Sequence, residues 1–413
     1  MGSSASEIIQ VLRERGFVQQ ITDEPSLVSC LNDEVVTFYA GFDPTATSLH
    51  VGSMIPLMAM AHLSRSGLRP IAVLGGGTAM VGDPSGKTEM RQLLTREVIQ
   101  ENRKGIEPQV RRFLVNAGEG AIVVDNADWL SSLNYLDFLR DIGRYFSVNR
   151  MLSAEAYKLR LEKGLSFIEF NYQILQAYDF LVLHREYGCK LQVGGDDQWG
   201  NILAGADLIR RVHQVETFGL TFPLITTSTG AKMGKTASGA VWLSPDRTPP
   251  YDFYQYFINV DDRDVGRFLR FLTFLPVQEI LRYEALQGAE LRIAKQALAF
   301  SVTEIVHGKA EAEKAAAAAL AAFGGQGSAD LVPSFAISLA AATQGICVVD
   351  LLCLAGLAAS KSAARRLIEQ GAVRLGDRKI TEVAEAISAE MISAEGTLLH
   401  AGKKNLKRIT VAS

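Results

Sequence analysis

The chain has 413 residues, of which 48% are hydrophobic and 21% are charged, and its 42 Lys and Arg residues against 45 Asp and Glu residues leave a net charge of −3. This composition excludes collagen-like, coiled-coil and disordered proteins and indicates a globular chain of about two to three domains. The near-neutral charge argues against a surface that binds nucleic acid everywhere, but it leaves room for a local basic patch.

The cysteines and the apolar segments indicate the compartment. Cys30, Cys189, Cys347 and Cys353 form no CxxC pair, which argues against a structural zinc site and favours a reducing environment. The N-terminal segment resembles neither a secretory signal nor a transit peptide, and the most apolar stretch, residues 346–359, is too short to span a membrane. We therefore expect a cytoplasmic protein that does not enter the membrane.

Residues 34 to 230 alternate between β-branched runs and helical patterns. Strands are expected at 35–39, 70–74, 121–124 and 190–193, with helices such as 53–65 and 167–186 between them. This alternation predicts an α/β fold with a parallel sheet covered by helices. Because such sheets bind ligands at the carboxyl ends of their strands, the segments that follow the expected strands are candidate sites: GFDPT, GGGTAMVGDPSGK, DNADW and GGDDQWGN.

The second half of the chain changes character twice. Residues 251–323 carry helical patterns only and predict a small helical domain, and residues 324–330 are rich in glycine as in a linker. From about residue 346 two short helical patterns precede a hairpin-like run at 373–380. We therefore predict an α/β domain at 1–230, a loop and helical domain at 231–323, a linker at 324–345 and a small α+β domain at 346–413.

Two apparent nucleotide motifs fail on their spacing. Gly86-Lys87-Thr88 would need a glycine at position 81 to form a phosphate loop, and that residue is Val81. The glycine run at 75–77 would need a further glycine at position 80, which is Met80, to match the dinucleotide fingerprint. Neither motif is present.

The segment from Tyr39 to Ser53 follows a strand and leads into a helix. Backbone amides near Gly52 and Ser53 would face a polyphosphate, and Thr45 and His50 could donate hydrogen bonds to its oxygens. The alternative is that His50 is a capping or core residue and Gly52 a packing glycine. An isolated HxG triplet favours that alternative.

Two further patterns are ambiguous by themselves. Lys232-Met233-Gly234-Lys235-Thr236 could close over a triphosphate or form an ordinary solvated loop. Tyr172, Gln176 and Asp179 share one face of an expected helix and could line a polar ligand site or form a satisfied buried network.

Taken together and in this order, the motifs closely resemble those of bacterial-type tyrosyl-tRNA synthetases, which are class I aminoacyl-tRNA synthetases. They are YxGFDPT with HVG, GDPSG at 82–86, the Tyr172/Gln176/Asp179 face, GGDDQWGN at 194–201 and KMGKT. The resemblance implies a Rossmann-like parallel-sheet catalytic domain, a small all-helical domain and a C-terminal S4-like RNA-binding domain. It also implies a homodimer that uses ATP to join L-tyrosine to tRNA(Tyr). Mg²⁺ would be held by the ATP phosphates, and no metal site formed by the protein is expected.

The resemblance also implies roles for individual residues. Tyrosine would contact Tyr39, Thr78, Asp83, Asn126, Tyr172, Gln176, Asp179 and Gln198. ATP would contact Gly41, Asp43, His50, Gly52, Ser53, Gly195, Asp197, Met233 and Lys235. Charge on the departing pyrophosphate would be stabilised by Thr45, His50, Lys87, Arg91, Lys232 and Lys235. Two segments depart from the family pattern: Ser53 replaces the second histidine of the first signature, and DNADW differs from the usual run around Asn126.

The C-terminal segment is locally basic, with ten Lys and Arg residues against six Asp and Glu residues from Lys361 to Ser413. RNA contacts are expected from Lys361, Arg365, Arg366 and Arg374, although a solvated helix face would look the same. Three other functions stay open at this point. They are a non-catalytic RNA-binding protein, which Ser53 would fit, a small-molecule nucleotidyltransferase, and a tryptophan-specific relative.

Overall fold

A computed structural model describes residues 7–85, 93–114, 120–153, 155–228, 230, 233–236, 239–322, 334–393, 396–402 and 405–412. The chain divides into two compact units. Unit 1 comprises residues 1–233, 242–244 and 266–281, and unit 2 comprises residues 234–241, 245–265 and 282–413.

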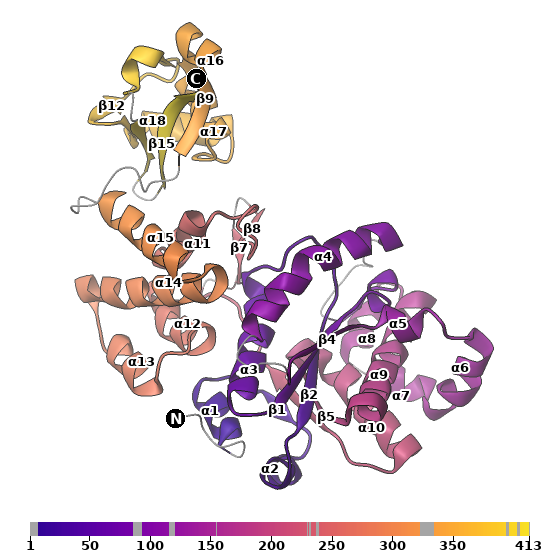
Figure 1. Ribbon diagram of the computed structural model, residues 1–413. Helices are drawn as coiled ribbons and strands as arrows, with labels where there is room; N and C mark the ends of the chain where they lie inside the picture. The colour runs from indigo at the N-terminus through magenta and orange to yellow at the C-terminus, as the bar shows by residue number, and fades with distance from the viewer. Residues whose placement is uncertain are drawn as a thin grey trace. The chain divides into compact units, whose positions relative to one another are not determined.

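The described part of unit 1 contains a six-stranded sheet in the order β1-β6-β5-β2-β3-β4 (Figure 1). Its strands are β1 Gln20–Ile21, β2 Thr37–Phe42, β3 Arg69–Leu74, β4 Ile122–Asp125, β5 Cys189–Gly195 and β6 Phe218–Phe222. All neighbours are parallel except β1, which is antiparallel to β6. The chain runs from β2 through β3 to β4 on one side and from β5 to β6 on the other. The switch point, where such sheets bind ligands, therefore lies between β2 and β5.

Several helices of unit 1 pack against this sheet. The described helices of this unit include α1 Ile8–Glu14, α2 Glu24–Asp33, α3 Met54–Arg65, α4 Arg96–Phe113, α5 Ala127–Leu130, α6 Tyr135–Asp141, α7 Val148–Leu152, α8 Glu155–Leu161, α9 Phe167–Tyr187, α10 Trp199–His213 and α12 Val265–Leu272. Helix α9 begins with a capping box between Ser166 and Glu169 and ends at Gly188, whose φ is +63°. It packs against β5 and α10, and Gly205 of α10 leaves room for the ring of Phe180.

Strand β2 begins and ends later than the sequence suggests. Strand β2 covers 37–42 instead of 35–39, and Val35 is 65% exposed. The strand continues because Gly41 and Phe42 pair with Val73 and Leu74 of β3. Sheet pairing, and not the β-branched run alone, therefore fixes where the polar loop after β2 starts.

Unit 2 contains two described groups of elements. One is helical, with α11 Pro250–Ile258, α14 Leu291–His307 and α15 Lys309–Ala322, and unit 2 also includes the short hairpin of β7 Lys235–Thr236 and β8 Gly239–Ala240. Helix α13 Val277–Glu284 is divided, with residues 277–281 in unit 1 and residues 282–284 in unit 2. The other group is a five-stranded sheet in the order β12-β11-β14-β15-β9, with α16 Leu339–Gln344, α17 Val348–Leu354 and α18 Lys361–Glu369 around a core of its own. Its strands are β9 Ser334–Ser338, β11 Val373–Leu375, β12 Arg378–Ile380, β14 Thr397–Ala401 and β15 Asn405–Ala412, and a short pair joins β10 Ile346–Cys347 to β13 Ala386–Ile387.

The segment predicted to be a linker is only partly one. Strand β9 and helix α16 lie within residues 324–345, and β9 pairs in parallel with β15 at the far end of the chain. The short sequence SFAIS gives a weak strand signal, and the strand is stabilised by this distant pairing and by the buried side chain of Ile337. No helix among the described residues is both long and apolar enough to cross a membrane.

Candidate active site

The ends of β2 and β3 carry a buried polar cluster. Thr78 Oγ1 donates to Asp43 Oδ1 at 2.8 Å, and the Tyr172 hydroxyl, which comes from α9, donates to Asp43 Oδ2 at 3.1 Å. A Cβ atom at Gly75 would lie 1.9 Å from Asp43 Oδ1, so only glycine allows the carboxylate to approach the loop after β3. The cluster therefore depends on the glycine run that fails as a dinucleotide motif.

A second carboxylate, Asp179 of α9, lies next to this cluster. Asn126 Nδ2 donates to Asp179 Oδ2 at 2.9 Å and to Thr78 Oγ1 at 3.0 Å, and Trp129 Nε1 donates to Asp179 Oδ1 at 2.7 Å. Burial raises the pKa of Asp179 to about 7, and the charges of Asp43 and Asp125 add to this rise, whereas the bonds from Asn126 and Trp129 oppose it. Trp129 is a residue that the sequence did not single out, although it stands in DNADW.

Tyr39 of β2 is 2% exposed, and its ring packs against Phe180 with a centroid distance of 5.3 Å. Burial raises the pKa of its hydroxyl, and so does the charge of nearby Asp179. Within the described part of the chain this hydroxyl has no hydrogen-bond partner. Buried polar groups are nearly always paired, so a polar ligand group is the natural partner of this hydroxyl.

Polar side chains from α9, η5 Asp196–Gln198 and α10 form a third group. Gln198 Nε2 donates to Asp83 Oδ2 at 2.7 Å, and Asn201 Nδ2 donates to Gln176 Oε1 and Gln198 Oε1, both at 3.1 Å. Asp83 is 6% exposed and also accepts the amide of Ser85. Asn201, which completes this group, was not predicted individually, although it ends the GGDDQWGN run.

His50 is a capping residue, as one of the two interpretations expected, and its contact with a polyphosphate stays a prediction. Its Nδ1 accepts the amide of Gly52 at 3.0 Å, so His50 caps η1 Val51–Ser53. This bond leaves the proton of the neutral ring on Nε2, and the residue is exposed, as is Thr45. A Cβ at Gly52 would lie 2.8 Å from His50 Cε1, so Gly52 is a close-approach glycine, and half-buried Ser53 leads into α3.

Four residues predicted to contact ATP line one cavity of about 200 Å³, namely Gly52, Gly195, Asp197 and Met233. Gly41 lies outside that cavity, and a Cβ added to it would face open space. A larger cavity of about 570 Å³ includes Asp197 but is otherwise formed mainly by α7, α10 and their neighbouring loops. None of the residues predicted to bind tyrosine lines this larger cavity.

Several predicted residues cannot be placed in this geometry. Lys87, Arg91 and Lys232 lie outside the described residues, and Lys235 is described only as part of the β7 backbone. The predicted RNA contacts lie in unit 2, where Lys361, Arg365 and Arg366 are exposed on α18 and Arg374 is exposed on β11. Lys361 pairs with Asp350 at 2.6 Å.

The parallel sheet with polar loops at its switch point is the arrangement of Rossmann-like nucleotide-binding domains. Residues 31–324 match the model of the family "tRNA synthetases class I (W and Y)", and residues 326–409 match that of the "Tyrosine--tRNA ligase SYY-like C-terminal domain". The chain is 50% identical over 406 residues to the tyrosine–tRNA ligase of Clostridium botulinum strain Hall, covering 98% of this chain and 100% of that protein.

Two further similarities agree. The tyrosine–tRNA ligase of Clostridium tetani is 49% identical, covering 98% of this chain and 99% of that protein. A C-terminally truncated mitochondrial tyrosyl-tRNA synthetase from Aspergillus nidulans has a TM-score of 0.67 and 33% identity, covering 75% of this chain and 92% of its own. The chain therefore belongs to the class I aminoacyl-tRNA synthetases, and within them to the tyrosyl-tRNA synthetase family.

Proposed function

We propose that this enzyme activates L-tyrosine with ATP to give tyrosyl-adenylate and pyrophosphate, and then transfers the tyrosyl group to the 3′ end of tRNA(Tyr). The observation that supports this proposal most directly is the buried pair of Tyr39 and Asp179. The pair offers an unpartnered hydroxyl and a carboxylate held by Asn126 and Trp129, which suit one phenol hydroxyl. Phenylalanine has no hydroxyl to offer this pair, so its binding would leave buried polar groups without a hydrogen bond, which weakens binding.

The polar clusters on either side of this pair suit the other end of the amino acid. Thr78, Asp83, Tyr172 and Gln176 would bind the α-ammonium group, because a buried carboxylate such as Asp83 is the partner that a cation needs. Asn126 would support this arrangement through Thr78 and Asp179, and Gln198 would lie beside the substrate carboxylate. Asn201 connects Gln176 with Gln198, and Gln198 in turn donates to Asp83, which supports placing these three side chains in one binding surface.

ATP is the co-substrate that this family uses, and we assign its adenosine and phosphates to the loops at the ends of β2 and β5. Gly41, Asp43, Gly52, Ser53, Gly195, Asp197 and Met233 would line this part of the site, and Asp197 would accept hydrogen bonds from ribose hydroxyls. Mg²⁺ would be bound by the phosphates and would offset their charge.

The proposed first step needs no protein nucleophile. A carboxylate oxygen of tyrosine attacks the α-phosphorus of ATP, the bond from that phosphorus to the bridging oxygen breaks, and pyrophosphate leaves with the electron pair. The protein orients the two reactants and stabilises the charge that moves onto pyrophosphate. Thr45, His50, Lys87, Arg91, Lys232 and Lys235 would supply this stabilisation, and the cap leaves the proton of the neutral His50 ring on Nε2.

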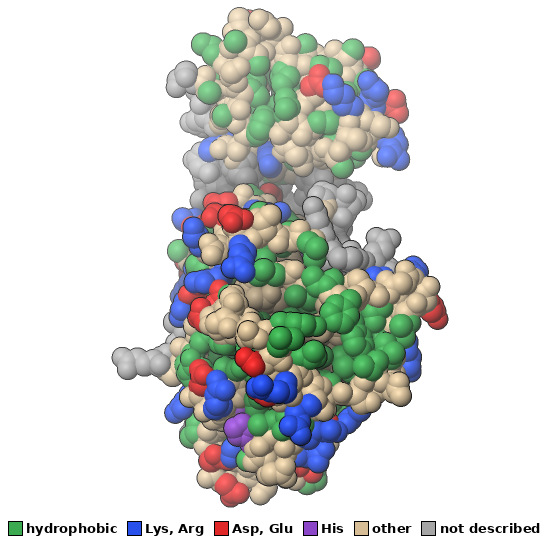
Figure 2. Space-filling view, turned by 90° about the vertical axis from the view of Figure 1, so that its right-hand side faces the viewer, with side chains coloured by type: hydrophobic (Ala, Val, Ile, Leu, Met, Phe, Trp, Pro, Cys, Tyr) green, Lys and Arg blue, Asp and Glu red, His purple; other side chains and the backbone are tan. Residues whose placement is uncertain are grey.

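The remaining proposals concern partners. The exposed cations of α18 and β11 would contact the tRNA backbone. A second copy of the chain would cover exposed apolar side chains on α6, α7, α8 and α9, and Figure 2 shows hydrophobic side chains gathered on one face of the molecule. The four unpaired cysteines suit a reducing cytoplasm.

The test is ATP–pyrophosphate exchange measured separately with tyrosine, phenylalanine and tryptophan. We expect exchange with tyrosine and little with the other two. Exchange that is fastest with tryptophan would instead support the tryptophan-specific alternative within the same family. No exchange with any of the three, from folded protein, would support a non-catalytic RNA-binding role.

A further inference from the structure

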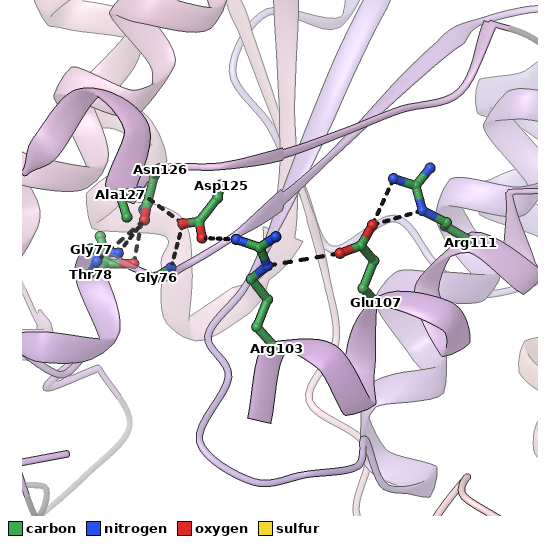
Figure 3. A network of polar contacts seen from close by, with 9 residues as sticks. All are labelled: Gly76, Gly77, Thr78, Arg103, Glu107, Arg111, Asp125, Asn126 and Ala127. Atoms are coloured by element: carbon green, nitrogen blue, oxygen red, sulfur yellow. Dashed lines mark hydrogen bonds and ion pairs between the residues drawn. The ribbon is translucent and has the colours of Figure 1, made fainter. Parts of the chain in front are cut away.

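Asp125, the last residue of β4, connects the two loops that hold the amino-acid site. Its Oδ1 accepts the Gly76 amide at 3.1 Å and the Ala127 amide at 2.9 Å, and its Oδ2 accepts Arg103 Nη1 of α4 at 2.7 Å (Figure 3). The side chain of Asp125 is 11% exposed, whereas that of Arg103 is 39% exposed. One carboxylate thus links the loop after β3, the loop after β4 and α4.

The loop after β3 is shaped to admit this carboxylate. A Cβ at Gly76 would lie 2.2 Å from Asp125 Oδ1 and 2.7 Å from Oδ2, so any larger residue at position 76 would push the carboxylate away. The next residues along both loops form a second connection, because Asn126 Oδ1 accepts the Gly77 amide at 2.7 Å. The Asp125 contact therefore lies directly beside the bonds that orient Thr78 and Asn126.

Helix α4 gives Asp125 a fixed anchor. Arg103 is also linked to Glu107, one turn later, at 3.8 Å, and Glu107 pairs with Arg111 at 2.7 Å. The same helix holds the loop after β2, since Asn102 Nδ2 donates to the Pro44 carbonyl at 2.9 Å. Arg103 also places a positive charge near a site that already contains the carboxylates Asp43 and Asp179.

We infer that Asp125 is a positioning residue for tyrosine. Through the amides of Gly76 and Ala127, it sets the directions in which Thr78 and Asn126 present their polar groups. The inference rests on the proposed function, and it concerns the DNADW segment in which this chain departs from its family. It assigns Asp125 no contact with the substrate.

Two substitutions at position 125 separate the loop contacts from the ion pair. Asp125→Asn with its oxygen at the Oδ1 position keeps the acceptor of both amides, but it replaces Oδ2, the acceptor of Arg103, with an NH2 donor, so the partly exposed Arg103 side chain must turn away. We expect its KM for tyrosine to stay within about twofold of wild type, because a partly exposed ion pair contributes little. Asp125→Ala removes every contact of the carboxylate: the Ala127 amide loses its acceptor, and the Gly76 amide keeps only the Leu74 carbonyl, 3.0 Å away. We expect its KM for tyrosine to rise roughly tenfold, with the KM for ATP unchanged.

A substitution in the other loop tests the same contact without removing the carboxylate. Gly76→Ala should raise the KM for tyrosine like Asp125→Ala, and the double variant should show little more than either alone, because both remove one contact. Gly120→Ala is the matched control, because a Cβ at Gly120 meets nothing within 4 Å. Arg13→Ala controls for the loss of an ion pair, since Arg13 pairs with Glu24 at 2.7 Å away from these loops.

All variants are compared in pyrophosphate exchange at a temperature well below their melting points. If the wild-type protein exchanges with tyrosine, and Asp125→Ala and Gly76→Ala keep the wild-type KM for tyrosine, this inference is overturned while the proposed function stands. Equal shifts in the KM for tyrosine and ATP, which indicate a merely structural role, or an Asp125→Asn variant as impaired as Asp125→Ala, would also overturn it. Wild-type protein that does not exchange with tyrosine would overturn the proposed function, and this inference with it.

Discussion

The hydroxyl of Tyr39 illustrates a conflict between stability and binding at a single residue. Burying a hydroxyl without a partner costs about 1–3 kcal/mol, so Tyr39→Phe should unfold with a free energy equal to wild type or higher by up to about 2 kcal/mol. The same substitution should weaken tyrosine binding and narrow the preference for tyrosine over phenylalanine. Urea unfolding without ligand, together with pyrophosphate exchange for both amino acids, measures the two effects. A variant that loses stability and keeps full discrimination would contradict the assignment.

Asp179 makes a prediction about pH, because burial raises its pKa from 3.8 to about 7. Between about pH 4 and pH 7 the folded protein retains a proton that the unfolded chain has lost. The free energy of unfolding therefore falls as the pH rises through this window, by on the order of 4 kcal/mol at most, and the loss is complete above pH 7.

The neutral variant Asp179→Asn isolates this contribution. Its free energy of unfolding, relative to wild type, should increase from pH 4.5 to pH 8, as measured by urea unfolding in a series of buffers. Curves for the two proteins that run parallel across this range would show that Asp179 is ionised throughout.

At the scale of elements, α9 is held by a buried ion pair at its first turn. Arg160 and Glu169 have side chains that are 4% and 2% exposed, and they form two bonds of 3.0 Å each, while Ser166 Oγ also donates to Glu169. Burial alone would raise the pKa of Glu169, but hydrogen bonds from Arg160 and Ser166 outweigh it and lower the pKa. The pair fixes the start of the helix that carries Tyr172, Gln176 and Asp179.

Breaking one half of this pair should cost far more than breaking an exposed pair. Arg160→Met leaves a buried carboxylate without its cation, and we expect a loss of about 3–5 kcal/mol in the free energy of unfolding. The double variant Arg160→Met, Glu169→Gln should recover much of that loss. Arg140→Met, which breaks an exposed pair with Asp141, is the control and should cost less than about 1 kcal/mol. Equal losses in the single and double variants would contradict the argument.

The same helix shows how far the sequence could predict the site. A period of 3.6 residues was enough to place Tyr172, Gln176 and Asp179 on one face, and Ser166 and Gly188 mark the two ends of α9. The partners of that face come from other elements: Trp129 lies in α5, after β4, and Asn201 lies in the first turn of α10. No local pattern predicts such contacts, just as none predicted that β9 would pair with β15.

At the scale of the whole molecule, exposed apolar side chains concentrate on one part of unit 1. Large exposed fractions occur at Tyr135 (60%), Leu136 (72%), Leu139 (52%), Val148 (57%), Leu161 (46%) and Phe167 (70%). The four helices that carry them share one hydrophobic cluster, which includes Phe138, Met151, Tyr157 and Phe170. We propose that the exposed apolar side chains of these helices form a subunit interface, because large exposed apolar side chains are typical of such surfaces.

Charges placed on this surface should separate the subunits. We expect wild-type protein to sediment with about twice the mass of one chain, and Leu136→Asp or Phe167→Asp to shift it toward the monomer, because a carboxylate would have to be buried without a partner. Val35→Asp is the control, since Val35 is 65% exposed, precedes β2 and does not belong to that cluster. Sedimentation equilibrium at several concentrations measures the change. A wild-type monomer, or Asp variants that dimerise as tightly as the control, would mean that another surface of the chain carries any self-association.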